Sequence, residues 1–437
     1  MSDEAKLSEL RERLGVILDL NRASALLGWD QQTMMPPKGV EGRSFQLSTL
    51  DRLSHELFVS DEMGRLIDEL DELQLDPGSV DAALLRVTRR DYEKARRVPS
   101  ELRSEITKAE VVGIPAWAEA RQNSDFDAFL PYLERNAELK RRYVECFQDT
   151  GKSDYDILLD DYQEDARSEE ITAIFERVKE VVVPLIQEVA ATEPLDVSFA
   201  HGHFPVEKQE IFAREILERL GYSSEAWRLD PTIHPFATSI SVDDIRLTTR
   251  YSEADAESVF HTTHEFGHGI YENGIDPELE RTPLVELNSM VLHESQSRLW
   301  ENLVCRSRPF WRHFFPRLQE LFPDQLGGTT EDQWWRYVNR VQPDLIRVEA
   351  DEVTYGLHII LRYELEQEIV AGRLDLRELP AAWNAKMKEY LGLDVPDDAR
   401  GVLQDVHWSG GSFGYFPTYL LGTIASVQIW EKVRSEL

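Results

Sequence analysis

Apolar residues recur at the spacing of an α-helix along most of this chain. Near the N-terminus, Leu7, Leu10, Leu14, Ile17 and Leu18 fall on one helix face, because residues three and four positions apart lie about one turn apart. A helix with one apolar face must bury it against another element. We therefore expect an all-α, mostly helical fold. The same stripe recurs at residues 130–144, 171–186, 211–220 and 357–369.

One central segment departs from this helical pattern. Residues 239–251 read S-I-S-V-D-D-I-R-L-T-T-R-Y, which is rich in β-branched residues and roughly alternates between apolar and polar. The pair Asp243 and Asp244 in its middle suits a turn. The segment predicts a small β-hairpin within one domain that spans residues 1–437. Residues 1–100 are expected to form a semi-separate helical layer.

The composition excludes several classes of protein. The chain has 437 residues, and 42% of them are hydrophobic, enough for a sizeable core and too many for a disordered or fibrous protein. Its 48 Lys and Arg against 81 Asp and Glu give a net charge of −33. Such a charge repels nucleic acid and anionic membrane surfaces, so we expect neither as a partner.

Signals for secretion or membrane insertion are missing from the sequence. The N-terminus has no basic start and no apolar segment of a signal peptide, and the best apolar run, Val181–Ile186, is short and contains Pro184. Cys146 and Cys305 stand alone, without a CxxC partner, so we expect two free, buried thiols. These features predict a cytoplasmic protein in a reducing compartment.

The segment that carries chemistry follows the predicted hairpin directly. Residues 257–273 have acidic residues near their start and Asn-Gly at their end, which are helix boundaries. Inside this helix His264, Glu265 and His268 form an HExxH pattern. Two imidazoles at i and i+4 share one face and can bind one Zn²⁺, and Glu265 beside them can take a proton from a water molecule. The alternative is a surface helix with two solvated histidines, which the apolar neighbours of the pattern argue against.

A catalytic zinc needs a third protein ligand and one open position. Glu294, in the helical segment 292–301, lies 26 residues after His268 and is our predicted third ligand. Its alternative role is an ion pair with Arg298 at i+4. His261 also lies on the ligand face, where a supporting or capping role is expected. The rival ligands are Glu286, His293 and Glu301.

These residues resemble a known family, the Taq-type metallocarboxypeptidases. The match joins His264–His268 with the run His293-Glu294-Ser295-Gln296, and it extends to the N-terminal stretch Leu26–Pro37. The resemblance therefore spans nearly the whole chain. Four further signatures occur in the family's order, namely His234-Pro235-Phe236; Asp244, Arg246 and Thr248; Ile346, Arg347, Ala350 and Asp351; and Gly401, Gln404, Asp405, His407 and Trp408.

The resemblance implies a zinc-dependent carboxypeptidase, in which Co²⁺ can substitute, acting on peptides. Such enzymes remove single residues from peptide C-termini with broad specificity, and they are usually homodimers. Their fold is almost wholly helical, with a small, three-stranded sheet beside a deep active-site groove that holds the metal. By analogy, the N-terminal helical layer covers this groove.

The remaining site residues follow from what an exopeptidase must do. Glu265 accepts the water proton and returns it to the leaving amine. The oxyanion needs further donors, for which the candidates are His407, Tyr415 and Tyr419. Core packing is the alternative for each tyrosine.

The terminal carboxylate needs a fixed cation, and a guanidinium suits it. The candidates are Arg347, which we favour, and Arg246. Asp351 at i+4 and Asp244 at i−2 could instead hold these arginines in structural ion pairs. His234 either lines the site or is a buried structural histidine.

Two other functions share part of this pattern. A zinc endopeptidase or oligopeptidase has the HExxH and the later glutamate, but it needs no arginine for a terminal carboxylate. A metal-stabilised helical scaffold or binding protein would fill the fourth metal position with a protein ligand. Glu265, placed beside the metal to act on a water molecule, argues against this alternative.

Overall fold

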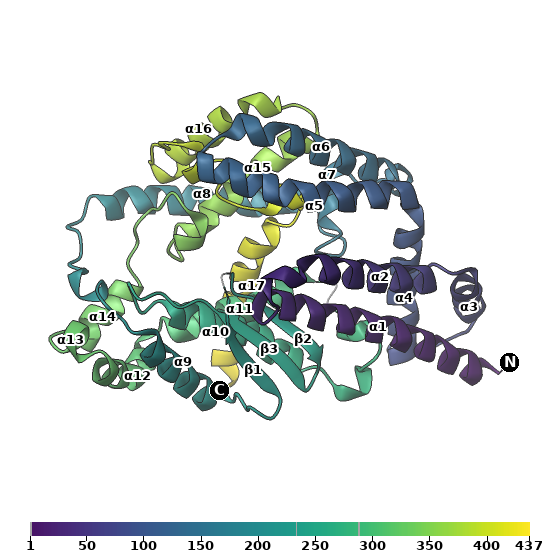
Figure 1. Ribbon diagram of the computed structural model, residues 1–437, viewed down its shortest axis with the longest axis horizontal. Coiled ribbons are helices and arrows are strands. Elements are labelled where there is room, and N and C mark those ends of the chain that lie inside the picture. The colour runs from purple at the N-terminus through teal and green to yellow at the C-terminus, as the bar shows by residue number, and fades with distance from the viewer. Residues whose placement is uncertain (1, 233, 287–288) are drawn as a thin grey trace. The chain divides into compact units, whose positions relative to one another are not determined.

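The computed structural model describes residues 2–232, 234–286 and 289–437, and helices dominate it as predicted (Figure 1). The chain divides into two compact units, each assembled from segments far apart in the sequence. The single domain expected from the sequence stays a prediction. Unit 1 comprises Met1–Arg96, Val197–Leu287 and Gln296–Glu331, and unit 2 comprises Arg97–Asp196, Asn288–Ser295 and Asp332–Leu437.

Unit 1 contains the N-terminal helices and the helix predicted to carry the metal ligands. Helix α9 (Val206–Leu220) ends at Gly221, whose φ of 113° is a left-handed conformation that glycine adopts without strain. The other elements are α1 (Asp3–Thr33), η1 (Pro37–Gly39), α2 (Val40–Phe58), α3 (Asp61–Asp71), α4 (Val80–Arg97), η3 (Ser198–Ala200), α10 (Ser258–Asn273), η4 (Pro277–Leu279), η5 (Pro283–Val285), a π-helical turn η6 (Leu299–Cys305), α12 (Arg308–Leu321) and α13 (Pro323–Leu326).

The small sheet of unit 1 has three strands in the order β1-β3-β2. The predicted hairpin is confirmed, because β2 (Ala237–Ser241) pairs antiparallel with β3 (Asp244–Thr249). Strand β1 (Trp227–Pro231) pairs parallel with β3, with Trp227 opposite Ile245. Its residues include an arginine, an aspartate and a proline, which are not typical strand formers.

Helix α10 packs directly on this sheet (Figure 1). Gly269 makes the approach possible, because a Cβ there would lie 2.6 Å from the Trp227 ring and 2.8 Å from Leu247. Phe266 of the same helix is buried against Trp227, with ring centroids 5.6 Å apart. The sheet and α10 therefore share one core.

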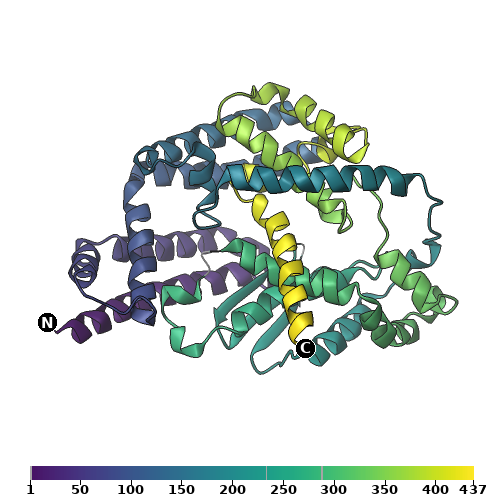
Figure 2. The ribbon, with the colours of Figure 1, turned by 180° about the vertical axis from the view of Figure 1, so that it is seen from behind.

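Unit 2 is organised around helix α15 (Tyr355–Val370), which is buried on nearly all sides. Apolar residues occur on every face of this helix, which is typical of a helix in a protein interior. Figure 2 shows α8 (Ser168–Ala190) and the C-terminal α17 (Pro417–Glu436) of this unit from behind. The remaining elements are α5 (Ser100–Asn123), α6 (Phe126–Glu145), η2 (Gln148–Thr150), α7 (Asp154–Leu159), α14 (Glu331–Val338), η7 (Arg347–Glu349), η8 (Leu376–Glu378), α16 (Leu379–Leu391), η9 (Asp398–Arg400) and η10 (His407–Gly410).

Helix α11 (Met290–Arg298) begins in unit 2 and ends in unit 1. Glu294, the predicted third metal ligand, lies on this helix.

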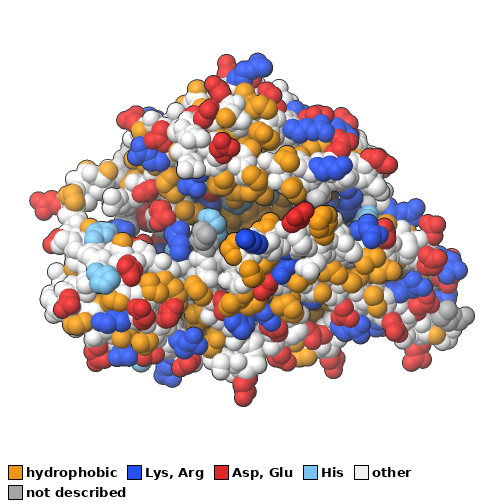
Figure 3. Space-filling view, viewed as in Figure 1, with side chains coloured by type: hydrophobic (Ala, Val, Ile, Leu, Met, Phe, Trp, Pro, Cys, Tyr) orange, Lys and Arg blue, Asp and Glu red, His pale blue; other side chains and the backbone are white. Residues whose placement is uncertain are grey.

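Three smaller expectations concern charge, thiols and membranes. Acidic and basic side chains are interspersed over the face drawn in Figure 3, so the negative charge is spread there and not gathered in one patch. Both cysteines are free, but only Cys305 is buried, whereas Cys146 is half-buried. Across residues 2–232, 234–286 and 289–437, no helix has the length and apolar character needed to cross a membrane.

Candidate metal centre and active site

Helix α10 presents the two predicted histidines on one face. The ring centroids of His264 and His268 lie 5.0 Å apart, as their i and i+4 positions require. Glu265 follows the first histidine, and only 5% of its surface is exposed. Phe260 and Phe266 beside them are buried. The helix is therefore an interior element, which excludes the alternative of a solvated surface helix.

Gly267 lets α10 approach the backbone of α11 closely. A Cβ at this position would lie 2.5 Å from the carbonyl oxygen of Gln296 and 2.5 Å from the Cα of Ser297. These two residues belong to the same unit as α10. Because α11 is one continuous helix, this contact also fixes Glu294, which stands two residues before Gln296.

The predicted ligand set comes together as a cluster. His264, His268 and Glu294 each place one ligand atom within 4.8 Å of the others. Among the described residues no other group of three His, Cys, Asp or Glu side chains meets this criterion, and neither Glu286 nor His293 belongs to the cluster. Two imidazoles and one carboxylate are a donor set that suits a catalytic zinc ion.

Glu301, which the sequence suggested as a rival ligand, is not part of the ligand cluster. It lies in the π-helical turn η6, and its carboxylate is 2.8 Å from Nδ1 of His264. A proton on Nδ1 donated to this carboxylate leaves Nε2 of His264 as the atom available to a metal. Glu301 therefore orients a ligand, and π-helical turns occur often at functional sites.

Charged neighbours keep this carboxylate ionised. Burial alone would raise the pKa of Glu301, but Arg298, the His264 ring and Arg306 together hold it well below its ordinary value. Arg298 Nη1 lies 3.1 Å from one carboxylate oxygen, and Arg306 Nη2 lies 3.6 Å from the other. Arg298 thus pairs with Glu301 at i+3.

Helix α17 passes close to the third ligand. A Cβ at Gly422 would lie 2.7 Å from the Cβ of Glu294, so only glycine permits this approach. Tyr419 stands three residues earlier on α17, on the same helix face. Burial raises the pKa of Tyr419 well above its ordinary value, and Glu294 raises it further. The Tyr419 hydroxyl is therefore neutral and can donate a hydrogen bond, and it interacts electrostatically with Glu294, a predicted metal ligand.

The other predicted oxyanion donors pack against Tyr419. The His407 ring stacks on Tyr415 with centroids 5.6 Å apart, and Tyr415 meets Tyr419 at 5.1 Å. Burial lowers the pKa of His407 to about 3 and raises the pKa of Tyr415 to about 12. All three side chains are half-buried and uncharged at neutral pH, so each can donate a hydrogen bond.

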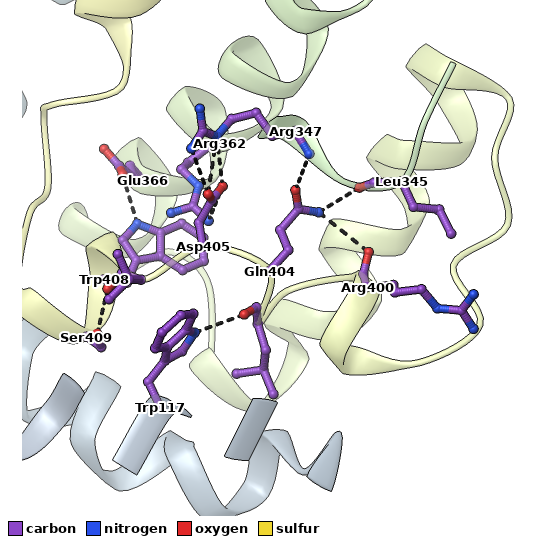
Figure 4. Close-up of polar contacts among 12 residues, drawn as sticks. Trp117, Leu345, Arg347, Arg362, Glu366, Arg400, Gln404, Asp405, Trp408 and Ser409 are labelled. Atoms are coloured by element: carbon purple, nitrogen blue, oxygen red, sulfur yellow. Dashed lines mark hydrogen bonds and ion pairs between the residues drawn. The ribbon is translucent and has the colours of Figure 1, made fainter. Parts of the chain in front are cut away.

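Arg347 is rigidly held in the interior of unit 2 (Figure 4). Its Nε and Nη2 bond the carboxylate of Asp405 at 3.0 and 2.8 Å, and its Nη1 donates to the Tyr355 hydroxyl at 2.9 Å. Asp351 does not form the pair considered from the sequence. It instead accepts from the backbone N–H of Val353 and Thr354 at the start of α15.

The two other predicted substrate-binding residues lie in unit 1. Arg246 on β3 bonds Asp244 through two nitrogens at 2.9 Å each, which is the structural ion pair considered as its alternative. Its guanidinium also lies 4.5 Å from the ring centroid of Trp29. His234 is exposed in the connection between β1 and β2, so it is not a buried structural histidine.

Sequence reasoning did not find two supporting carboxylates. Glu301 was considered only as a ligand, and no local signal marks it as the partner of His264, 37 residues away. Asp405 stands in a quoted signature, but its partner Arg347 is 58 residues distant. Both pairings arise from packing between segments.

Comparisons with known proteins agree with this geometry. Residues 9–437 match the family described as carboxypeptidase Taq (M32) metallopeptidase. The chain is 41% identical to thermostable carboxypeptidase 1 of Thermus thermophilus, covering 100% of this chain and 88% of that protein. It is 38% identical to carboxypeptidase 1 of Bacillus subtilis, covering 98% and 86%.

A solved structure gives the same result. The carboxypeptidase of this family from Deinococcus radiodurans R1 superposes with a TM-score of 0.95 at 38% identity, covering 99% of this chain and 87% of that one. A match over nearly the full length, in both sequence and fold, includes the helix with the histidine pair and the helix with Glu294. This chain therefore belongs to the carboxypeptidase Taq family and is a metallocarboxypeptidase.

Proposed function

We propose that this enzyme uses zinc, bound by His264, His268 and Glu294, to release single amino acids from peptide C-termini with broad specificity. The observation that carries the proposal is the cluster of these three ligand atoms within 4.8 Å, beside the buried Glu265. The Glu301 contact supports it, because it leaves Nε2 of His264 to face a metal. Co²⁺ has similar ligand preferences and is expected to substitute.

A bound zinc ion would supply Lewis acidity, lowering the pKa of water toward about 7 and polarising the scissile carbonyl. Glu265 accepts the proton of the attacking water and returns it to the leaving amine. A positioned general base of this kind contributes roughly 10²–10⁴-fold in rate. His407, Tyr415 and Tyr419 donate hydrogen bonds to the developing oxyanion. These three side chains are half-buried and uncharged at neutral pH, which supports this assignment.

Arg347 is proposed to bind the terminal carboxylate, which explains cleavage of one residue at a time. Asp405 and Tyr355 take three of its five N–H groups, so two donors remain for a substrate. Arg246 is engaged by Asp244, which makes it the weaker candidate. Arg246 and His234 are proposed to line the substrate-binding surface without anchoring the carboxylate.

We also propose that the enzyme is a homodimer, which the family resemblance supports, and that it works in the cytoplasm. Sedimentation of the purified enzyme at micromolar concentration tests the first of these assignments, with a monomer mass contradicting it.

The test of the main proposal is release of free arginine from an N-acylated Ala-Arg dipeptide. Metal-replete enzyme should release it, chelation should abolish the release, and Zn²⁺ or Co²⁺ should restore it. The variant Glu265→Gln should bind the metal normally but lose about 10²–10⁴-fold in kcat. Glu272→Gln, near the end of α10, is the matched control and should retain activity.

Amidated Ala-Arg separates the remaining alternatives. A carboxypeptidase should not hydrolyse the amidated peptide. An endopeptidase should cleave longer peptides at the same rate whether their C-terminus is amidated or free. Bound zinc without cleavage of any peptide would favour a scaffold instead.

A further inference from the structure

Two charged side chains of α15 lie in the interior of unit 2 and have no part in the steps above. Arg362 and Glu366 are each 0% exposed, and their i and i+4 positions place them on one helix face. A charge removed from water is costly unless it is paired. Their partners therefore indicate why the chain retains them.

Arg362 lies among aromatic rings and beside one carboxylate, and Figure 4 shows it with Trp408 and Asp405. Its guanidinium lies 4.2 Å from the ring centroids of both Trp408 and Phe416. Its Nη2 lies 3.3 Å from Oδ2 of Asp405. In the described part of the chain its nitrogens have no hydrogen-bond partner, so this ion pair is its main polar contact.

Asp405 is thereby shared between two arginines. Arg347 bonds both of its oxygens, and Arg362 approaches one of them. At the other end, the carboxylate of Glu366 accepts hydrogen bonds from Trp408 Nε1 at 2.8 Å and from the Gly414 N–H at 2.9 Å. The four charges alternate in sign in the order Glu366, Arg362, Asp405, Arg347.

This order bears on the strength of Arg347 as an anchor. An isolated Arg347–Asp405 pair would be electrically neutral and would attract a second carboxylate weakly. Because Arg362 also neutralises Asp405, more of the positive charge of Arg347 remains for a substrate. Nearby His358 and His407 add no charge, since burial lowers their pKa values to about 4 and about 3.

Stability alone does not account for Arg362. Replacing buried ion pairs by apolar side chains of similar volume is often neutral or stabilising. A methionine between the Trp408 and Phe416 rings would pack well. The cost of keeping a fully buried arginine points to a role in function.

We propose that Arg362 is a positioning residue, which shares Asp405 with Arg347 so that the Arg347 guanidinium keeps its orientation and its charge toward the substrate carboxylate. This inference rests on the proposed anchoring role of Arg347. Arg362 itself touches neither substrate nor metal in this scheme.

The experiment compares steady-state kinetics on N-acylated Ala-Arg for three variants of the metal-replete enzyme. Arg347→Lys tests the anchor, because lysine lacks the planar fork. The double variant Arg362→Met with Glu366→Gln removes one charge of each sign, so that no unpaired charge is left buried. Glu364→Gln, on α15, breaks the partly buried pairs with Lys179 and Lys386 and is the matched control.

The double variant should raise KM about tenfold or more while kcat stays within about threefold, which is the pattern of lost substrate binding. The control should lower thermal stability with an unchanged KM. If Arg347→Lys raises KM and the double variant does not, the positioning role is wrong and the anchor stands. If Arg347→Lys leaves KM unchanged, the anchor itself is wrong. A double variant that is less stable but has wild-type KM marks a purely structural role and overturns the inference.

Discussion

Replacing Gly267 by alanine should disturb the metal centre without touching a ligand. The new Cβ would lie 2.5 Å from the Gln296 carbonyl oxygen and from the Ser297 Cα, whereas ordinary contacts begin at 3.4 Å. Both opposing atoms are backbone, so no flexible side chain can move aside. Helices α10 and α11 must therefore separate by about 1 Å, which is about half the length of a zinc–nitrogen bond.

The expected magnitudes follow from that displacement. Overpacking of this kind costs roughly 1–3 kcal/mol, offset by up to about 1 kcal/mol from the better helix propensity of alanine. His264 and His268 move with α10, whereas Glu294 stays with α11. A misplacement of about 1 Å at a catalytic site costs on the order of 10²-fold in rate. We expect kcat/KM to fall about 100-fold, with weaker metal binding.

The assay combines metal competition against a coloured chelator with thermal unfolding of the metal-free protein. Gly42→Ala is the control, because this glycine is also in a helix but nothing lies within 4 Å of its added Cβ. The control should match or slightly exceed the wild type in stability, with full metal affinity. Wild-type metal affinity and activity in Gly267→Ala would refute the argument that this contact sets the ligand geometry.

Two further outcomes follow from the buried groups. Glu301→Gln should weaken metal binding about 10–100-fold while one metal still binds per chain, because His264 loses its charged orienting partner; equal affinity in the chelator competition would contradict this. Burial lowers the pKa of His358 to about 4, below its unfolded value near 6.5, so its contribution to stability is present above pH 6.5 and is lost as the pH falls toward 4. His358→Leu should remove about 1.4 kcal/mol per pH unit from that slope in urea unfolding of metal-free protein, and an unchanged slope would show that His358 does not titrate on unfolding.

Local sequence patterns were sufficient for the elements that depend on short-range geometry. The HExxH pair was readable because the i and i+4 positions share a face in any helix, and α10 spans Ser258–Asn273 against the predicted residues 257–273. The hairpin of β2 and β3 was also predictable from local sequence, because its alternating strands and its turn are contiguous in the chain. Helical stripes likewise predicted α6, α8, α9 and α15.

Tertiary structure alone decided which distant residues meet. Strand β1 joins the sheet by pairing in parallel with β3. A parallel pair is not connected by a tight turn, so no local sequence signal predicts it. Glu301 contacts His264, and Asp405 contacts both Arg347 and Arg362. These contacts depend on how helices and loops pack. A carboxylate or a guanidinium has the same local sequence signature whether it binds a metal, a substrate or a buried partner. The sequence by itself therefore determined the helical fold and the histidine pair, and only the packed structure determined the partners of its buried charges.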